Sequence, residues 1–169
     1  MHINTYIQQQ VANAHAQVDA VMQDLTEEQF NWVPPGTINP ISVILTHILG
    51  GEDFFMQGLL QDKPRCWDAQ AWSPKIGIQS PPGPGRNWDE FKTIKIPLPP
   101  VLAYGQAVRA ATDACLAGLA AGELDRQVNF AGRLRMVAEI LMISVVHTAS
   151  HAGEIAAVKG MQGLKGLPY

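Results

Sequence analysis

Two histidines and a glutamate are spaced so that a single helix would present them together. His147, His151 and Glu154 occur in the segment HTASHAGE, at steps of four and three residues. A step of four residues turns an α-helix by about 400°, so both imidazoles project from one face, about 6 Å apart. That spacing lets two ring nitrogens reach one metal ion at about 2.0–2.1 Å. The segment therefore predicts part of a metal site on an otherwise apolar helix.

A third histidine, His47, lies in the apolar stretch SVILTHILGG. Three histidines from two helices would leave the other coordination positions of a metal open, as in catalytic rather than structural sites. We predict that the metal ligands are His47, His147 and His151. The HExxH motif is absent because Thr148 stands where its glutamate would be. Glu154 is interpreted as an acceptor for an imidazole N–H or as an exposed partner of a cation.

The remaining titratable residues are expected to have structural or surface roles. His2 is near the N-terminus, and His15 falls at the boundary of an apolar face. Glu52 and Asp53 follow His47 by five and six residues, off its helical face, and are expected to cap, pair or line a rim. The sequence assigns no catalytic residue. Four methionines are expected to fill the core: Met56, Met136, Met142 and Met161.

Helical periodicity indicates the elements that must position these residues. Four segments are expected to be helices: 4–24, 40–60, 101–121 and 133–163. Thr26 and Gln29 form a capping-box pattern, Asn39 is the expected N-cap of the second helix, and Gly122 the expected end of the third. No segment has the pattern of a β-strand.

The segment 61–99 is different in composition. Its prolines and glycines prevent a long helix, and Trp67, Trp72 and Trp88 are expected to anchor it by packing. The sequence thus predicts an all-α fold: a four-helix bundle in one domain, 1–169, with a long crossover connection between helices two and three.

Composition limits the possible partners. The chain has 169 residues and a net charge of −3, which gives little reason to expect nucleic-acid binding. No uninterrupted apolar run approaches the roughly 18 residues of a membrane span, and MHINTYIQQQ lacks the pattern of a signal peptide, so we expect neither. Cys66 and Cys115 are interpreted as free thiols in a reducing compartment, which favours the cytoplasm. Only 16% of residues are charged, against about 25% in an average domain, so we expect a homodimer and a partly apolar cleft roofed by 61–99.

Three segments together resemble the DinB-like superfamily. HTASHAGEIAAVKGMQGLKGLPY is similar to its last-helix motif, ISVILTHILGGEDFF to its second-helix motif, and DLTEEQFNWVPP to the connection between its first two helices. Residues 61–99 match no recognised part of it. The resemblance implies a four-helix bundle, a tendency to dimerise, and a divalent metal, often nickel or zinc, on His47, His147 and His151.

The resemblance transfers the site better than the reaction. Characterised relatives include a mycothiol-dependent maleylpyruvate isomerase and bacillithiol transferases, in which the metal is thought to bind the thiol of the cofactor. The first hypothesis is therefore a metal-dependent transferase or hydrolase that activates a low-molecular-weight thiol or water for a small-molecule substrate. The alternatives are a non-enzymatic metal- or ligand-binding stress-related protein, and a structural bundle with hydrogen-bonded histidines. Arg86, Lys92, Arg133 and Arg135 are candidate contacts for an anionic ligand, although each is also interpretable as a solvated charge.

Overall fold

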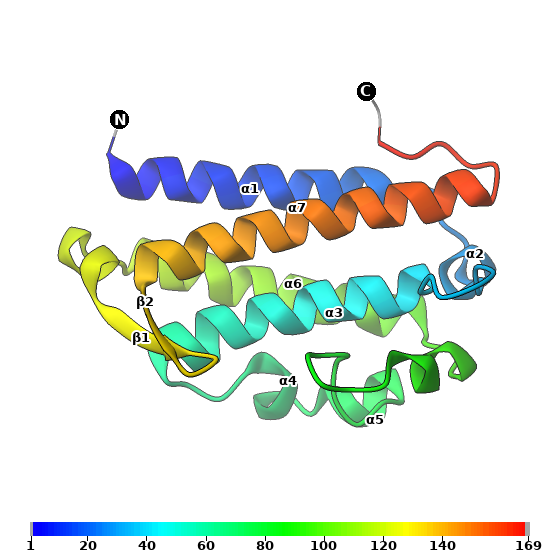
Figure 1. Ribbon diagram of the computed structural model, residues 1–169, viewed down its shortest axis with the longest axis horizontal. Helices are drawn as coiled ribbons and strands as arrows, with labels where there is room; N and C mark the ends of the chain where they lie inside the picture. The colour runs from blue at the N-terminus through cyan, green and yellow to red at the C-terminus, as the bar shows by residue number, and fades with distance from the viewer. Residues whose placement is uncertain (1, 168–169) are drawn as a thin grey trace.

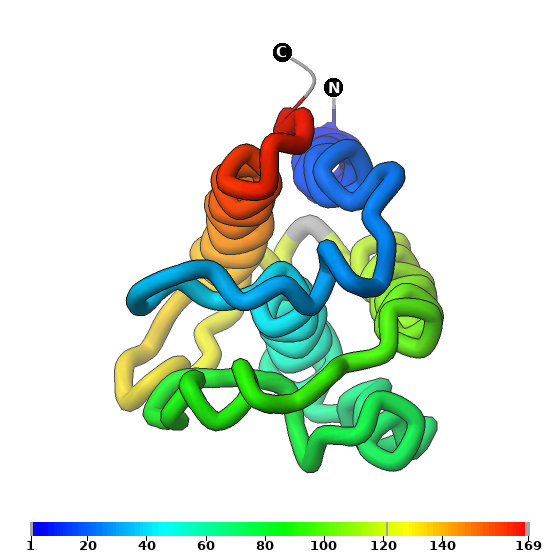
Figure 2. Tube along the Cα trace, turned by 90° about the vertical axis from the view of Figure 1, so that its right-hand side faces the viewer, coloured from blue at the N-terminus to red at the C-terminus, as the bar shows by residue number. Residues whose placement is uncertain are grey.

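Four long helices form the body of the protein in the computed structural model, which describes residues 2–167 (Figure 1). They are α1 (Ile3–Met22), α3 (Ile41–Asp53), α6 (Leu98–Ala117) and α7 (Val137–Met161). Helix α1 packs against α7 and α6, and α3 packs against the same two helices. Seen from the end, α3 lies between α7 and α6 (Figure 2). Pro168 and Tyr169, the end of the C-terminal motif, lie outside the described residues.

Helix α3 is buried on almost every side. Of its thirteen residues, eleven are buried, because α6, α7 and the connection that follows cover it. It begins at Ile41 with Pro40 as its N-cap, so the predicted Asn39 cap is wrong. The predicted helix 40–60 continues as a π-helix, η1 (Phe54–Leu59). Such wide turns often accompany functional sites.

The connection between α3 and α6 wraps around one side of α3 (Figure 1). It contains α4 (Cys66–Ala69), α5 (Trp72–Ile76) and a 3₁₀ turn, η2 (Trp88–Thr93). Trp67 and Trp72 are buried with their rings 5.2 and 5.7 Å from that of Tyr104, so the predicted anchoring is confirmed for both. The capping box predicted at Thr26 and Gln29 is also confirmed, at the start of α2 (Glu27–Asn31).

A β-hairpin precedes α7. Strands β1 (Gln127–Phe130) and β2 (Arg133–Met136) pair antiparallel, with Phe130 opposite Arg133. Ala131 and Gly132 form the two-residue turn, and both have the positive φ of a type I′ turn, +52° and +78°. The expectations of no strand and of a helix starting after Gly132 are therefore wrong. Alanine rarely adopts positive φ, so this turn gives almost no signal in the sequence. The fold is mostly helical, as predicted, with this hairpin as its exception.

Two further boundary predictions need correction. Helix α6 ends at Ala117 with Gly118 as its C-cap, and Gly122 lies instead in a 3₁₀ turn, η3 (Ala121–Asp125). Met56 is buried, but Met136, Met142 and Met161 are exposed and do not fill the core.

Helix α7 is 25 residues long and contains an 18-residue window of mean hydropathy 1.2, so by length and composition it could cross a membrane. Core helices of globular proteins pass the same test. Here α7 packs against α1 and α3, and 33% of that window is buried.

The buried carboxylate of Asp53 joins α3 to α6 and to the connection between these two helices. Asp53 is 1% exposed. Its two oxygens accept hydrogen bonds from the backbone N–H groups of Cys66 and Trp67, each at 2.9 Å, and from the Tyr104 hydroxyl, also at 2.9 Å. Burial and the adjacent Asp53 carboxylate raise the pKa of Tyr104 far above its usual range, so the phenol stays a donor. Asp53 is therefore a pairing residue, one of the roles predicted for it.

We predict that Asp53→Ala lowers the free energy of unfolding by about 3 kcal/mol or more, because it leaves three buried donors unpaired. Urea denaturation monitored by circular dichroism measures this change. Asp68→Ala, which removes a carboxylate that is 56% exposed, should cost no more than about 1 kcal/mol. Equal losses in the two variants would contradict the role assigned to Asp53.

Candidate metal centre

The structure brings the three predicted histidines together between α3 and α7. The imidazole of His47 lies 4.7 Å from that of His147 and 4.8 Å from that of His151, centroid to centroid. The two α7 imidazoles are 4.7 Å apart. One ring nitrogen from each histidine can be chosen so that all three lie within 4.8 Å of one another. Among the described residues, this trio forms a group of donors compact enough for one metal ion.

Hydrogen bonds fix how two of these rings face the centre. The Nδ1 of His47 lies 2.8 Å from the carbonyl oxygen of Pro82, and the Nδ1 of His151 lies 2.7 Å from Oε2 of Glu154. Both partners are acceptors, so each Nδ1 must carry the proton. In the neutral imidazole the other nitrogen, Nε2, then presents a lone pair. This is the arrangement in which metal-binding histidines are usually held, with Glu154 as the acceptor that the sequence suggested.

The distance between the ring nitrogens of two histidines also suits a metal ion. Nε2 of His147 lies 2.8 Å from Nε2 of His47. Two nitrogens bound to one ion at about 2.1 Å are separated by about 3.0 to 3.4 Å when they subtend about 90 to 109°. The pair is thus close to the separation that shared coordination requires. Without an ion, the same contact is satisfied when His147 donates its Nε2 proton to His47.

The surroundings of His47 and His147 favour the neutral imidazole. Burial, together with charge repulsion from the neighbouring His47 and His151, lowers the pKa of His147 to about 4. Burial also lowers the pKa of His47, although its bond to Pro82 acts in the opposite direction. Neutral imidazole is the form that binds a metal. At neutral pH the pair therefore needs no deprotonation before an ion binds.

Two glycines of α3 give His147 and the connection room to approach. A Cβ on Gly51 would lie 2.9 Å from Cε1 of His147, and a Cβ on Gly50 would lie 2.3 Å from Cβ of Pro81. No other residue type fits at either position without displacing these neighbours. The pair costs roughly 1 kcal/mol per glycine relative to alanine. The close packing of Pro81 and His147 against these glycines accounts for that cost.

A cavity of about 630 Å³ adjoins the histidines. His47 and His147 form part of its wall, and the prolines of 81–84 form another part, as expected of a cleft roofed by 61–99. Trp88 packs on His47, 4.5 Å between ring centroids. None of the four cationic residues suggested by the sequence lines this cavity: Arg86, Lys92, Arg133 and Arg135. Arg65, which the sequence analysis missed, does.

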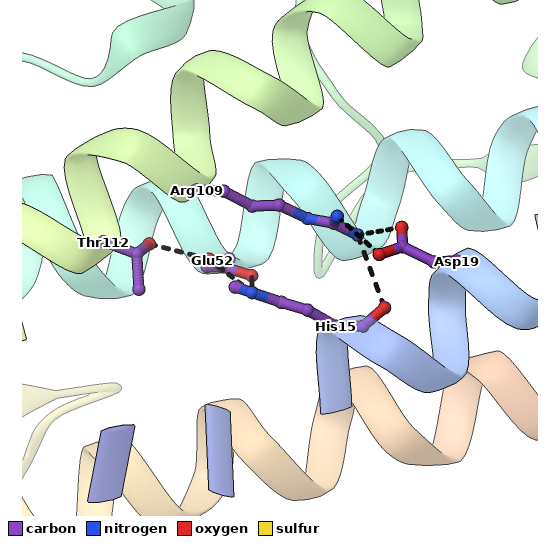
Figure 3. Close-up of polar contacts among 5 residues, drawn as sticks. All are labelled: His15, Asp19, Glu52, Arg109 and Thr112. Atoms are coloured by element: carbon purple, nitrogen blue, oxygen red, sulfur yellow. Dashed lines mark hydrogen bonds and ion pairs between the residues drawn. The ribbon is translucent and has the colours of Figure 1, made fainter. Parts of the chain in front are cut away.

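His15 and Glu52 form a second polar group (Figure 3). Nε2 of His15 lies 2.9 and 3.0 Å from the two oxygens of Glu52, and Oε1 of Glu52 accepts a bond of 2.6 Å from Thr112. Beside them, Arg109 pairs with Asp19 at 2.7 Å. The network joins α1, α3 and α6. His15 is partly buried, as expected of a residue at the boundary of an apolar face, and Glu52 has the pairing role predicted for it.

Comparison with known proteins bears on this arrangement. The sequence profile of the DinB superfamily matches residues 10–155. The chain belongs to the DinB superfamily. The resemblance seen in the sequence is thus confirmed over most of the chain, including all three histidines.

One solved structure, of a conserved protein from Enterococcus faecalis, has this DinB-like fold. It superposes with a TM-score of 0.81 over 94% of this chain and 96% of its own, at 16% identity. At that identity the likeness establishes the fold alone. None of the curated proteins compared matches the sequence.

The lowered pKa values predict how stability responds to pH in the metal-free protein. In the unfolded chain these imidazoles have a pKa near 6.5, so between about pH 6.5 and 4 the unfolded state binds more protons. The free energy of unfolding should therefore fall as pH is lowered through this interval. Urea titrations of the chelator-treated protein at several pH values would measure it.

His147→Gln should weaken this pH dependence, since glutamine does not titrate. His2→Gln, at an exposed position, should leave it unchanged. A pH profile that is the same in the wild type and in His147→Gln would show that His147 does not carry the effect.

Proposed function

We propose that the protein is a metal-dependent enzyme. It would bind one divalent metal ion through His47, His147 and His151. The observation that carries the proposal is the fixed orientation of two imidazoles: the Pro82 carbonyl and the Glu154 carboxylate each accept from Nδ1. Imidazole ligands suit zinc and nickel among the divalent ions, so one of these is the proposed metal. Three protein ligands would leave positions open to a substrate or cofactor.

The bound ion would supply Lewis acidity, lowering the pKa of a thiol or water that approaches its open positions. The chain contributes the rest. The Pro82 carbonyl orients His47, Glu154 orients His151, and Gly51 leaves room for His147. The aromatic wall formed by Phe54, Phe55 and Phe130 limits the access of water to the cavity and favours an apolar substrate.

The cysteines of the chain support the proposal that any reactive thiol comes from a small molecule. Burial raises the pKa of Cys66 to about 11, and burial also raises that of Cys115. Both are buried, and neither lines the cavity. Because the thiolate is the nucleophile, neither residue suits that role. Two free cysteines also agree with the proposed cytoplasmic location.

An enzyme and a non-enzymatic metal-binding protein differ in turnover. The metal-loaded protein can be incubated with low-molecular-weight thiols and a thiol-reactive electrophile while free thiol is followed. Consumption of thiol above the uncatalysed rate, dependent on the three histidines, would support the enzyme. Saturable binding of the thiol without consumption would support a binding protein.

We predict that the protein purifies with about one equivalent of metal and that His147→Ala/His151→Ala loses it. Two of three ligands are removed, and the remaining imidazole of His47 binds an ion weakly on its own. Elemental analysis after dialysis gives the stoichiometry. His2→Ala is the matched histidine control and should retain the metal. Full metal content in the double variant would overturn the ligand assignment.

A second pair of variants tests the geometry without removing a ligand. Gly51→Ala pushes the imidazole of His147 away and should lower metal affinity about tenfold or more. Gly153→Ala, in α7 with open space around the new methyl group, should leave affinity unchanged.

We also propose that the protein is a homodimer that pairs along α1 and α7. Four large apolar side chains on these helices are exposed by 46 to 59%: Ile3, Tyr6, Met142 and Val146. They line one shallow groove of about 370 Å³ between the two helices. Exposed apolar surface of this kind is typical of an interface. A dimer through this groove would account for the low charge content of the chain.

Sedimentation velocity at micromolar concentration should give twice the mass of the 18.4 kDa chain. Met142→Glu/Val146→Glu should give the monomer, since a dimer would have to bury four added carboxylates. Leu134→Glu, at a more exposed apolar residue on the hairpin, should leave the dimer intact. A monomeric wild-type protein would contradict the proposal.

A further inference from the structure

One cationic residue lines the cavity beside the candidate metal centre. Apart from the histidines, Arg65 is the only ionisable residue that the described part of the chain, residues 2–167, contributes to the wall of this cavity. The surrounding side chains are largely apolar, among them Phe54, Phe55, Phe130 and Ile143. A cation against an apolar wall is costly to desolvate, so a ligand that displaces water from it is favoured when it carries a negative charge.

The guanidinium of Arg65 is only partly used. Its Nε and Nη2 both approach a single oxygen, Oδ2 of Asp68, at 3.0 Å. Nη1 has no bonding partner among the described residues, so the edge formed by Nη1 and Nη2 keeps N–H donors to spare. Asp68 is 56% exposed, and such solvent-facing pairs are weak. The guanidinium therefore keeps the capacity to bind a second carboxylate.

The backbone next to Arg65 is held firmly. The next two residues, Cys66 and Trp67, donate their N–H groups to the buried Asp53 at 2.9 Å each. The Arg65 carbonyl accepts the N–H groups of Asp68 and Ala69, which closes the first turn of α4. Binding of a ligand by Arg65 therefore does not have to order this part of the backbone.

We propose that this cavity binds a small organic monocarboxylate with an aromatic or branched apolar body, and that Arg65 holds the carboxylate through its Nη1–Nη2 edge. A single cation matches a single negative charge, and the planar guanidinium matches the planar carboxylate. The apolar body lies along the phenylalanine wall. The ligand thereby extends toward His47 and His147. Only this last point rests on the proposed function, because the contact with Arg65 requires no metal.

The test compares two probes of the same shape, 3-phenylpropionate and 3-phenylpropanamide, by isothermal titration calorimetry on the purified protein. We expect the carboxylate to bind about tenfold more tightly or better, as charge-assisted paired hydrogen bonds predict. Arg65→Gln should reduce carboxylate affinity to that of the amide and leave the amide unchanged, which also shows that the cavity is intact. Arg65→Lys, which keeps the charge but loses the paired donors, should be intermediate.

The matched control is Arg86→Gln. Arg86 also pairs with a carboxylate, Glu90, but lies outside the cavity wall, so its loss should change neither affinity. Equal binding of the two probes to the wild type, or an undiminished preference in Arg65→Gln, would overturn the proposal.

Measuring the affinity of both probes again after chelator treatment distinguishes the proposed Arg65 site from the proposed metal centre. A carboxylate preference that depends on Arg65 and survives chelation supports the Arg65 site whether or not the metal centre exists. A preference that disappears with the metal, and is insensitive to Arg65, would mean that the carboxylate binds the ion and would overturn the assignment to Arg65. The metal content of Arg65→Gln should equal that of the wild type.

Discussion

The fold depends on the need to satisfy polar groups on a helix that has almost no contact with solvent. Helix α3 carries His47, Glu52 and Asp53, and burying such groups without partners would cost several kcal/mol each. Every partner comes from another element. His47 meets His147 of α7 and the Pro82 carbonyl of the connection. Glu52 meets α1 and α6, and Asp53 meets α4 and α6. The surrounding elements are therefore placed by these bonds as well as by apolar packing, which is less specific in direction.

This dependence explains which features could be predicted from the sequence. The step of four residues places His147 and His151 on one face of a helix, and the step of three residues allows Thr26 and Gln29 to form a capping box. Both features could therefore be predicted from local spacing. The resemblance to the superfamily then associated His47 with the other two. Contacts between distant residues had no such signal. Glu52 is 37 residues from His15 and 60 from Thr112, and nothing in their spacing relates them. The hairpin was missed because its turn uses an alanine with positive φ.

The position of Arg65 in the cavity wall also could not be predicted from the sequence. In the sequence it is one of twelve basic residues, in a proline-rich segment without periodicity. Its role in the cavity follows from Asp53, because that carboxylate binds the two backbone N–H groups that come directly after it. The sequence left two interpretations open for other basic residues, such as Arg86 and Arg135: contacts for an anion, or solvated charges. Both arginines pair with nearby glutamates, Glu90 and Glu139. Arg65 also pairs with a nearby carboxylate, Asp68, so it is its place in the cavity wall that distinguishes it from these cations.

Gly50 and Gly51 show how the candidate site and the fold constrain each other. Helix propensity disfavours two adjacent glycines near the end of a buried helix, and packing must compensate. Here each glycine contacts a different neighbour. Pro81 of the connection packs on Gly50, and the ring of His147 packs on Gly51. The backbone of α3 itself thereby forms one side of the cavity, between its roof and the histidines. A larger residue at 50 would displace Pro81 in the segment that covers the cavity. A larger residue at 51 would displace His147, a proposed metal ligand. The two positions therefore separate access to the cavity from the geometry of the metal centre, although they are neighbours in the chain.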